Sequence, residues 1–308
     1  MTEAPRFSVV VPCYNQARFL RTAVDSALGQ SYAGLEVIVV NDGSTDDTLD
    51  VARSYGDRIQ LVDQKNRGLA AARNAGLLVS TGEFINFLDS DDWLDPDFLK
   101  HQLAASDGSS ASVFVGEWIL SDRDESALGH RGVAIPGDAY RFLLRGNPMP
   151  CHALTVLRSV VEEVGSFDES LEAYEDWDLW LRLAAAGHSF AAAPEARVFY
   201  RRYQGSMSRD TDRMLGAARK VLHKHRGRHW FARLRAAKAI RYGLFCDNVL
   251  TPARRVRSES GRWVGWRTAI AGVFRHPMFV ESALLFALFA AIMPLRRLFG
   301  AADESLEG

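Results

Sequence analysis

The stretch FINFLDSDDWLDP, residues 84–96, places an apolar strand directly before a cluster of carboxylates. Its first residues are apolar at consecutive positions, as in parallel strands covered by helices on both faces. Asp89, Asp91 and Asp92 follow within four positions, and such carboxylates repel one another unless a cation lies among them. The stretch therefore predicts a parallel α/β sheet with a site at the end of one strand.

Three other apolar runs in the first ninety residues have the same character. The expected strands are residues 7–11, 35–40, 59–62 and 83–88, and segments with helical spacing lie between them at residues 20–28, 48–53 and 69–78. This alternation predicts a doubly wound α/β fold with a mostly parallel sheet flanked by helices. Ligands of such sheets bind beyond the carboxyl ends of the strands.

Polar residues follow each expected strand. The four segments are PCYN at 12–15, NDGS at 41–44, KNRG at 65–68 and DSDD at 89–92. One such segment is typical of a turn, but four at one sheet edge indicate a ligand site. Tyr14 is either a core aromatic or an exposed ring that stacks on a nucleobase. Arg67 and Arg73 are either surface residues or partners of a diphosphate.

The DSDD segment does not fit a calcium-binding EF-hand loop. Such a loop starting at Asp89 needs Gly at its sixth position and Glu at its twelfth, where this chain has leucine and lysine. A divalent cation held by one or two carboxylates and by substrate phosphates fits better. Asp95, Pro96 and Asp97 are expected to begin the next helix, with Asp95 as its N-cap.

A second acidic pair opens a helix expected from about residue 173 to 187. Its apolar stripe is formed by Trp177, Trp180, Leu181 and Ala184. Glu175 and Asp176 in the first turn either complement the helix dipole or include a general base, and spacing alone leaves both interpretations open. Asp178 is expected at the surface.

The composition suits one or two globular domains in a reducing compartment. The chain has 308 residues, of which 47% are hydrophobic. Its three cysteines lack the spacing of a disulfide framework or a zinc site. The first residues lack the pattern of a signal peptide. A cytoplasmic location is therefore expected.

The net charge of −1 hides an uneven distribution. Residues 1–212 contain 19 Lys and Arg against 32 Asp and Glu, whereas residues 213–308 contain 18 against 6. Residues 213–241 alone contain ten Lys and Arg and no acid. This basic segment is interpreted as a solvated helical extension, a nucleic-acid site or a membrane-binding surface. The second interpretation is disfavoured because no nucleic-acid motif accompanies the charge.

An uncharged stretch at residues 282–295 favours the membrane interpretation. It is shorter than the roughly twenty residues needed to cross a bilayer. It suits an interfacial helix, a core helix or a dimer contact, and it reaches the length of a span only when extended back to Pro277 past Glu281. We therefore expect peripheral binding to an anionic membrane, at the inner face of the cell membrane.

Five motifs, in order, resemble the family 2 inverting glycosyltransferases, which have the GT-A fold. The motifs are VVVPCYNQARFLRTAVDSALGQSY, EVIVVNDGSTDDT, NRGLAAARNAG, GEFINFLDSDDWLDP and GSFDESLEAYEDWDLWLRLAAAG, and the resemblance covers about residues 7–210. It implies a glycosyltransferase domain at residues 1–212, with a nucleotide-binding half at 1–104 and an acceptor half at 105–212. Residues 105–170, including His152, are expected to shape the acceptor pocket. Residues 213–308 form the basic helical region.

The resemblance also implies roles for individual residues. The nucleotide-binding residues are Pro12, Tyr14, Asn15, Asp42, Arg67, Asp89 and Ser90. The DSD segment is the DxD-type motif, in which Asp91 binds Mg²⁺ or Mn²⁺ and Asp89 is a second candidate ligand. Asp176 is the general base. Relatives often have a His in a YRxHxxSxS-like run, where this chain has YRRYQGSMS with Tyr203 near the His position. Candidate contacts to the diphosphate or acceptor are therefore Glu175, Arg201, Arg202 and Tyr203.

The implied activity is metal-dependent, inverting transfer of a sugar from a nucleotide-sugar donor, with UDP as the expected nucleotide. The acceptor is a hydroxyl of a saccharide or lipid-linked saccharide, in the synthesis of cell-surface polysaccharide or glycolipid. Two alternatives stay open: a sugar-nucleotide nucleotidyltransferase and a nucleotide-sugar-binding protein without catalysis. The first lacks support because PCYNQARF has no Gly- and Arg-rich phosphate loop. An oligomer is compatible with the sequence.

Overall fold

The computed structural model describes residues 7–121, 127–203 and 206–225. The chain divides into two compact units, Met1–Ser206 with Gly216–Arg233 and Met207–Leu215 with Leu234–Gly308. The sheet, the helices before residue 207 and all residues of the candidate site belong to the first unit. The apolar stretch at residues 282–295 lies outside the described residues, as does most of the basic segment. No helix among the described residues has the length and apolar character required to cross a bilayer.

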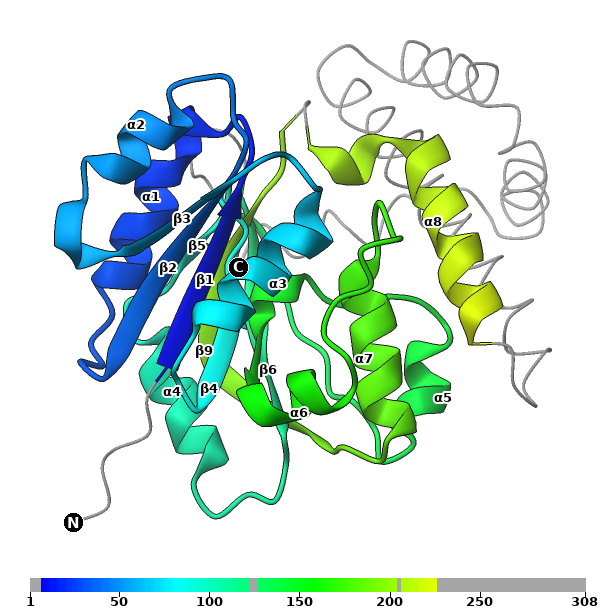
Figure 1. Ribbon diagram of the computed structural model, residues 1–308. Helices are drawn as coiled ribbons and strands as arrows, with labels where there is room; N and C mark the ends of the chain where they lie inside the picture. The colour runs from blue at the N-terminus through cyan, green and yellow to red at the C-terminus, as the bar shows by residue number, and fades with distance from the viewer. Residues whose placement is uncertain (1–6, 122–126, 204–205, 226–308) are drawn as a thin grey trace, which may run out of the picture. The chain divides into compact units, whose positions relative to one another are not determined.

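The first unit is built on one mixed sheet of nine strands (Figure 1). The strands are β1 (Phe7–Cys13), β2 (Leu35–Asp42), β3 (Gln60–Gln64), β4 (Phe84–Phe87), β5 (Trp93–Leu94), β6 (Val113–Ser121), β7 (Ala127–Arg131), β8 (Leu154–Leu157) and β9 (Phe190–Arg201). Their order is β3-β2-β1-β4-β8-β6-β9-β5, with β7 paired to β6. Strands β3, β2, β1 and β4 are parallel, as predicted. Strand β8 runs antiparallel to β4 and β6, and β9 is parallel to β6.

Helices cover both faces of the parallel half of the sheet. The helices are α1 (Ala17–Leu28), α2 (Thr48–Arg53), α3 (Leu69–Val79), α4 (Phe98–Ser106), α5 (Ala139–Leu143), α6 (Arg158–Glu163), α7 (Glu175–Ala185) and α8 (Thr211–Lys224), with short 3-10 turns at Gly56–Arg58, Cys151–Ala153 and Met207–Arg209. Figure 1 shows α1 and α2 on one face and α3 on the other. This is the doubly wound arrangement that the alternating pattern predicts.

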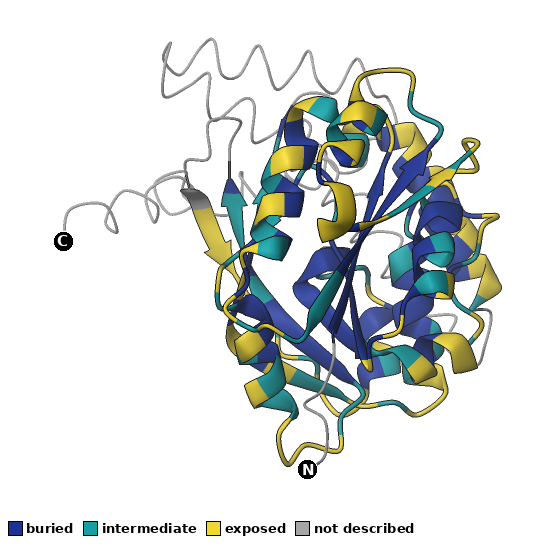
Figure 2. Cartoon of the chain, turned by 60° about the vertical axis from the view of Figure 1, so that its left-hand side comes forward, coloured by how far each residue is buried: buried dark blue, intermediate teal, exposed yellow. Residues whose placement is uncertain are grey.

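The core lies between these layers, and the parallel strands at its centre are buried (Figure 2). Every residue of β1 is buried, and α1 turns its apolar stripe inward. Helix α3 approaches β1 closely because it has Gly76 at the contact. A Cβ on Gly76 would lie 2.3 Å from Cγ1 of Val10.

The structure corrects two expectations about local structure. Helix α4 begins at Phe98, so Asp97 and not Asp95 is in the N-cap position. Asp95 instead closes the preceding turn, because its side chain accepts from the backbone N–H of Asp97 and its carbonyl accepts from that of Phe98. The strands and helices expected from the sequence include none within residues 105–150, which contain the long strand β6, the edge strand β7 and α5.

Candidate active site

The loops after β1 and β2 are tied to each other by Asn15. Its backbone has a left-handed φ of 53°, and its Oδ1 accepts from the backbone N–H of Thr45 at 2.8 Å. The N–H of Asn15 donates to Oγ of Ser44 at 3.0 Å. Tyr14 beside it is 47% exposed, so it is not a core aromatic. Pro12 is buried in β1.

Asp42 organises the loop that contains Arg67. Its Oδ1 accepts from Nε2 of Gln64 at 2.7 Å and from the N–H of Arg67 at 2.9 Å, and its Oδ2 accepts from the N–H of Gly68 at 2.8 Å. A carboxylate has about four acceptor positions, so one remains for a ligand. The Arg67 side chain is about half exposed and pairs with Glu169 at 2.8 Å.

Arg73 is the buried cation beside the DSDD segment. It is only 2% exposed, its Nη2 lies 2.6 Å from Oδ1 of Asp89, and its Nη1 lies 2.5 Å from Oε1 of Glu175. One guanidinium group therefore joins the loop after β4 to the first turn of α7. The sequence left open whether Arg73 is a surface residue or contacts a diphosphate; in the structure it is an internal bridge. Glu175 is accordingly buried and faces Arg73.

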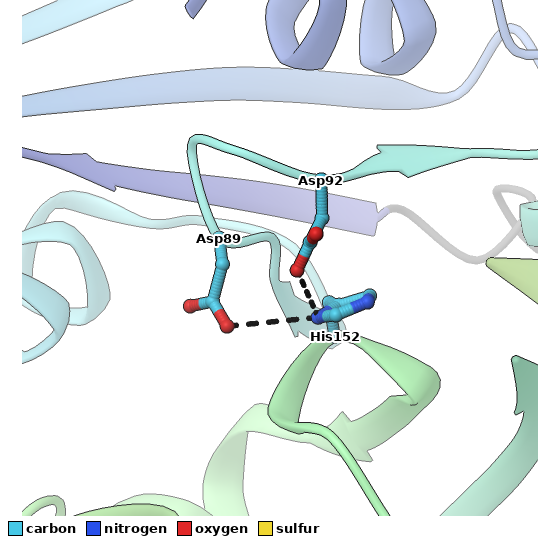
Figure 3. A group of neighbouring side chains, drawn as sticks. All are labelled: Asp89, Asp92 and His152. Atoms are coloured by element: carbon cyan, nitrogen blue, oxygen red, sulfur yellow. Dashed lines mark ion pairs between the residues drawn. The ribbon is translucent and has the colours of Figure 1, made fainter. Parts of the chain in front are cut away.

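His152 lies beneath the DSDD segment, between two of its carboxylates (Figure 3). Its Nδ1 is 3.3 Å from Oδ2 of Asp92 and 3.6 Å from Oδ2 of Asp89, and the ring is fully buried. Burial, together with the charges of Asp91 and Asp89, raises the pKa of Asp92 well above its usual range. Burial opposes ionisation of Asp89 as well, but Arg73 and His152 hold its pKa low. His152 thus supports this loop from inside.

These residues fit a divalent cation. Ligand atoms of Asp89, Asp92 and His152 lie within 4.8 Å of one another. Within the described part of the chain, Oδ2 of Asp92 and Nδ1 of His152 are buried and have no hydrogen bond of normal geometry. Asp91 is half-buried, and burial followed by the Asp89 charge raises its pKa. A bound cation would stabilise the ionised form of a carboxylate in that position, and oxygen ligands suit Mg²⁺ and Mn²⁺.

Tyr203 and Arg201 hold the other side of the DSDD segment. The Tyr203 hydroxyl hydrogen-bonds Asp91 and accepts from Nε2 of Gln16 at 3.1 Å. The backbone N–H of Arg201 donates to Oδ1 of Asp92 at 2.6 Å, and its Nε donates to the carbonyl of Asp91 at 2.8 Å. The Arg201 guanidinium also lies over the ring of Trp93, 4.6 Å from the centroid. Ser90 is buried within this loop, and Arg202 is half-buried at the end of β9.

Asp176 is held at the start of α7 with a pKa suited to a base. Its Oδ2 accepts from Nδ2 of Asn147 at 2.9 Å, and its Oδ1 accepts from the N–H of Trp177 at 2.7 Å. Burial and then the neighbouring Glu175 charge raise its pKa to about 7. Trp177 anchors the helix, because its ring is fully buried and its Nε1 donates to the carbonyl of Leu143 at 2.7 Å. A carboxylate with this pKa accepts a proton efficiently near neutral pH.

The turn before Asp176 is backbone-strained. Tyr174 has a left-handed φ of 57°, which is uncommon for an aromatic residue. Its ring packs edge-on against Trp177, with ring centroids 5.4 Å apart. Such strain persists only where surrounding contacts fix the backbone, and it is frequent at active sites.

Asp178 is not at the surface, so that prediction is wrong. Its side chain is fully buried, and it forms ion pairs with Arg182 on α7 and with Lys224 and His225 at the end of α8. Arg182 is one helical turn away, but Lys224 and His225 are 46 and 47 residues away, so helical spacing gives no sign of these two partners. Asn147 was also missed, because nothing in the segment around it indicates a contact with Asp176.

The sequence matches a known family over half its length. The sequence model described as Glycosyl transferase family 2 matches residues 8–165, and a second, described as Glycosyltransferase like family 2, matches residues 149–263. An uncharacterized glycosyltransferase of Rickettsia typhi is 34% identical over 188 residues, which is 59% of this chain and 59% of that protein. The hyaluronan synthase of Pasteurella multocida is 43% identical over 192 residues, which is 61% of this chain and 19% of that protein. The chain thus spans less than two thirds of the length of these relatives.

Solved glycosyltransferase structures share the fold. The mannosyltransferase PcManGT from Pyrobaculum calidifontis, in complex with GDP-Man and Mn²⁺, has a TM-score of 0.58 and 22% identity, covering 97% of this chain and 84% of that one. S. aureus TarS 1–349, in complex with UDP-GlcNAc, has a TM-score of 0.54 and 18% identity, covering 88% of this chain and 92% of that one. The predicted GT-A fold is confirmed.

Proposed function

Because this chain belongs to glycosyl transferase family 2, we propose that it transfers a sugar from a nucleotide-sugar donor to an acceptor hydroxyl with inversion at the anomeric carbon. The observation that supports this most strongly is the juxtaposition made by Arg73. It brings the DSDD segment after β4 and the acidic pair that opens α7 to one buried guanidinium. A donor bound at the DSDD segment and a proton acceptor in the acidic pair would therefore lie close together.

The donor side is formed by the loops after β1, β2 and β4. We assign the nucleobase to the exposed Tyr14 ring, on which it stacks, and to the remaining acceptor position of Asp42. Asn15 fixes these loops, Pro12 is proposed to line the nucleotide site beside it, and Asp89 and Ser90 are the proposed contacts to the ribose. Arg67 is exposed enough to leave Glu169 and offset the diphosphate charge. UDP is the proposed nucleotide.

Asp91 is the proposed direct ligand of a Mg²⁺ or Mn²⁺ ion, with Asp89 as the second carboxylate. Such an ion, when bound, offsets the charge that develops on the departing nucleoside diphosphate. Tyr203 and Arg201 orient Asp91, since the first hydrogen-bonds its side chain and the second its carbonyl. Arg202 and Glu175 are secondary candidates for contacts near the diphosphate or acceptor. Glu175 acts here through Arg73, because it is buried against that residue.

Asp176 is the proposed general base. It takes the proton from the acceptor hydroxyl as that oxygen attacks the anomeric carbon, and the nucleoside diphosphate leaves from the opposite face. A single in-line displacement of this kind inverts the carbon and needs no covalent enzyme intermediate. The hydrogen bond from Asn147 keeps the carboxylate oriented.

The acceptor is proposed to be a saccharide or lipid-linked saccharide in the synthesis of polysaccharide or glycolipid. The likeness to a hyaluronan synthase over 61% of this chain supports a polysaccharide product. A place at the inner face of the cell membrane, bound peripherally, would bring the enzyme to such an acceptor.

Donor binding and turnover of Asp176→Asn test the proposal. We expect the variant to bind UDP-sugar in the presence of Mn²⁺ as the wild type does, and to lose transfer by a factor of about 10²–10⁴. Removal of divalent cations with EDTA should weaken UDP binding to the wild type, measured by calorimetry. Wild-type turnover in Asp176→Asn contradicts the base assignment, and metal-independent binding and turnover contradict the metal assignment.

A further inference from the structure

Asp178 is a buried charge for which the proposed reaction has no use. It lies on α7 two residues after Asp176, and its side chain is fully buried. Its Oδ2 accepts from Nε of Arg182 at 2.8 Å and from Nζ of Lys224 at 2.9 Å. Its Oδ1 lies 3.0 Å from Nε2 of His225. Three basic groups thus surround one carboxylate in the interior of the first unit.

The hydrogen bonds to Asp178 are strong enough to keep it ionised. Burial alone raises its pKa, but hydrogen bonds from His225 and Lys224, together with the Arg182 charge, bring the pKa to about 2. Arg182 belongs to the same helix as Asp178, one turn further on. Lys224 and His225, in contrast, are the last described residues of the chain and lie at the end of α8. The contact therefore fastens α8 to α7.

The two acids of α7 face opposite sides of the helix. Residues two positions apart on an α-helix are about 200° apart around its axis. Asp176 accordingly contacts Asn147, whereas Asp178 contacts α8. Helix α7 is held from behind by the end of α8 while its other side presents Asp176.

The same lysine also holds the segment that precedes α7. Nζ of Lys224 lies 2.6 Å from Oδ2 of Asp168. The next residue, Glu169, pairs with Arg67 in the donor half. Arg182 donates from Nη1 to the carbonyl of Val164 and from Nη2 to that of Ser166, both at 2.5 Å. The end of α8 is thus linked to α7, which carries Asp176, and to the segment whose Glu169 pairs with Arg67.

We propose that Lys224 and His225 are positioning residues, which act through Asp178 and Asp168 to hold α7 and the segment at residues 164–172 in the arrangement needed for transfer. The proposal rests on the proposed function, because it assigns these residues an effect on the reaction at Asp176. It also places the end of α8 within the catalytic unit, beyond the boundary that the sequence predicts at residue 212.

The test compares two double variants of the full chain that remove the same number of basic groups from neighbouring positions near the end of α8. The first is Lys224→Met with His225→Gln. The matched control is Arg219→Met with His223→Gln, since both side chains are exposed. A Lys224→Arg variant keeps the charge and serves as the rescue. Transfer kinetics are measured well below the unfolding temperature of each variant, and hydrogen exchange is followed by mass spectrometry.

We expect the Lys224/His225 variant to lose kcat by about tenfold or more with donor KM changed less than about twofold, because small displacements of a catalytic group lower the rate steeply. Amide exchange over residues 164–185 should accelerate, while exchange in β1 and β2 stays as in the control. Lys224→Arg should recover most of kcat. A folded Lys224/His225 variant with the kcat and exchange of the control overturns the proposal, as does a lower unfolding temperature with unchanged kcat. If the wild type transfers no sugar from any nucleotide-sugar, the proposed function fails, and the exchange comparison still tests whether α8 holds α7.

Discussion

Arg73 and Arg67 are two arginines of the same site whose ion pairs should differ greatly in value. Arg73 is buried between Asp89 and Glu175, whereas the pair of Arg67 with Glu169 is about half exposed. Replacing a buried partner leaves uncompensated charges, which costs about 3–5 kcal/mol of unfolding free energy. An exposed pair contributes about 0–1 kcal/mol. We therefore expect Arg73→Met to destabilise the protein strongly and Arg67→Met to leave its stability nearly unchanged.

Urea unfolding of the two variants and the wild type measures this difference. Arg67→Met should weaken donor binding although it leaves stability nearly unchanged, because Arg67 is the residue proposed to contact the diphosphate. Equal destabilisation by the two substitutions would mean that the buried bridge is not stronger than a surface pair.

The raised pKa of Asp176 predicts an acidic limb in the pH dependence of kcat. A general base is active only when ionised, so kcat should fall as the pH drops through about 7. The hydrogen bond from Asn147 stabilises the ionised form and lowers this pKa. Asn147→Ala should therefore move the limb to higher pH by about one to two units, since a hydrogen bond to a charged group contributes about 1.5–3 kcal/mol.

Asn74→Ala is the control for that shift. Asn74 hydrogen-bonds Phe167 and Glu169 and does not contact Asp176 among the described residues. The acidic limb of the Asn74→Ala variant should lie at the same pH as that of the wild type. A limb that Asn147→Ala leaves in place would show that a group other than Asp176 controls the rate.

At the residue scale, the sequence indicated the exposed and motif-bearing positions better than the buried charges. The polar strand ends and the acidic pair at Asp176 could be identified because their residue types are unusual directly after an apolar run or before an apolar stripe. Arg73, His152 and Asp178 could not, because burial of a charge depends on partners distant in the chain. The partner of Asp178 at Lys224 is 46 residues away, and that of Arg73 at Glu175 is 102 residues away.

At the element scale, Gly76 and Gly216 are helical glycines in contrasting surroundings. A Cβ at Gly76 would lie 2.3 Å from Val10, while one at Gly216 meets nothing within 4 Å. Overpacking at a close helix–strand contact costs about 1–3 kcal/mol. Alanine in an exposed helix interior is instead favoured over glycine by about 0.5–1 kcal/mol.

Gly76→Ala should therefore lower the unfolding temperature, and Gly216→Ala should raise it. Differential scanning calorimetry of both variants gives the two signs in one experiment. A stabilising Gly76→Ala would show that α3 can move away from β1 without loss.

The elements of the parallel half were predictable because each is a local pattern. Helix α2 begins and ends at the predicted residues, and β1 to β4 differ from the predicted strands by one or two residues at their ends. The half of the sheet that contains β6 and β9 was not predicted, because these two strands pair across more than sixty residues and β9 alternates buried and exposed positions irregularly. Register between such strands is set by tertiary packing and not by local sequence.

At the scale of the whole molecule, part of the basic segment at residues 213–241 belongs to the first unit. The boundary between the acidic and basic parts of the sequence, at residue 212, is therefore not the boundary between the two units. Two basic groups of the 213–241 segment, Lys224 and His225, are engaged with the buried Asp178 of the first unit. These groups are less available to lipid phosphates than the sequence alone indicates. The proposed attraction to an anionic membrane therefore depends mainly on basic residues beyond 225.

That dependence can be tested with two sets of substitutions that change the net charge equally. The first replaces Arg226, Arg228, Arg233 and Arg235 by Gln. The second replaces Arg21, Arg53, Arg58 and Arg197, all exposed on the first unit, by Gln. Each basic residue near an anionic surface contributes about 1 kcal/mol, so the first set should weaken partitioning to vesicles rich in phosphatidylserine at least tenfold, whereas the second should change it little.

The wild-type affinity should also fall as salt rises, because exposed charges are screened within about 10 Å at 0.1 M ionic strength. Vesicle sedimentation at two salt concentrations measures both effects. Equal losses for the two sets would show that the attraction depends on net charge alone. No loss for either set would show that electrostatics is not the basis of membrane binding.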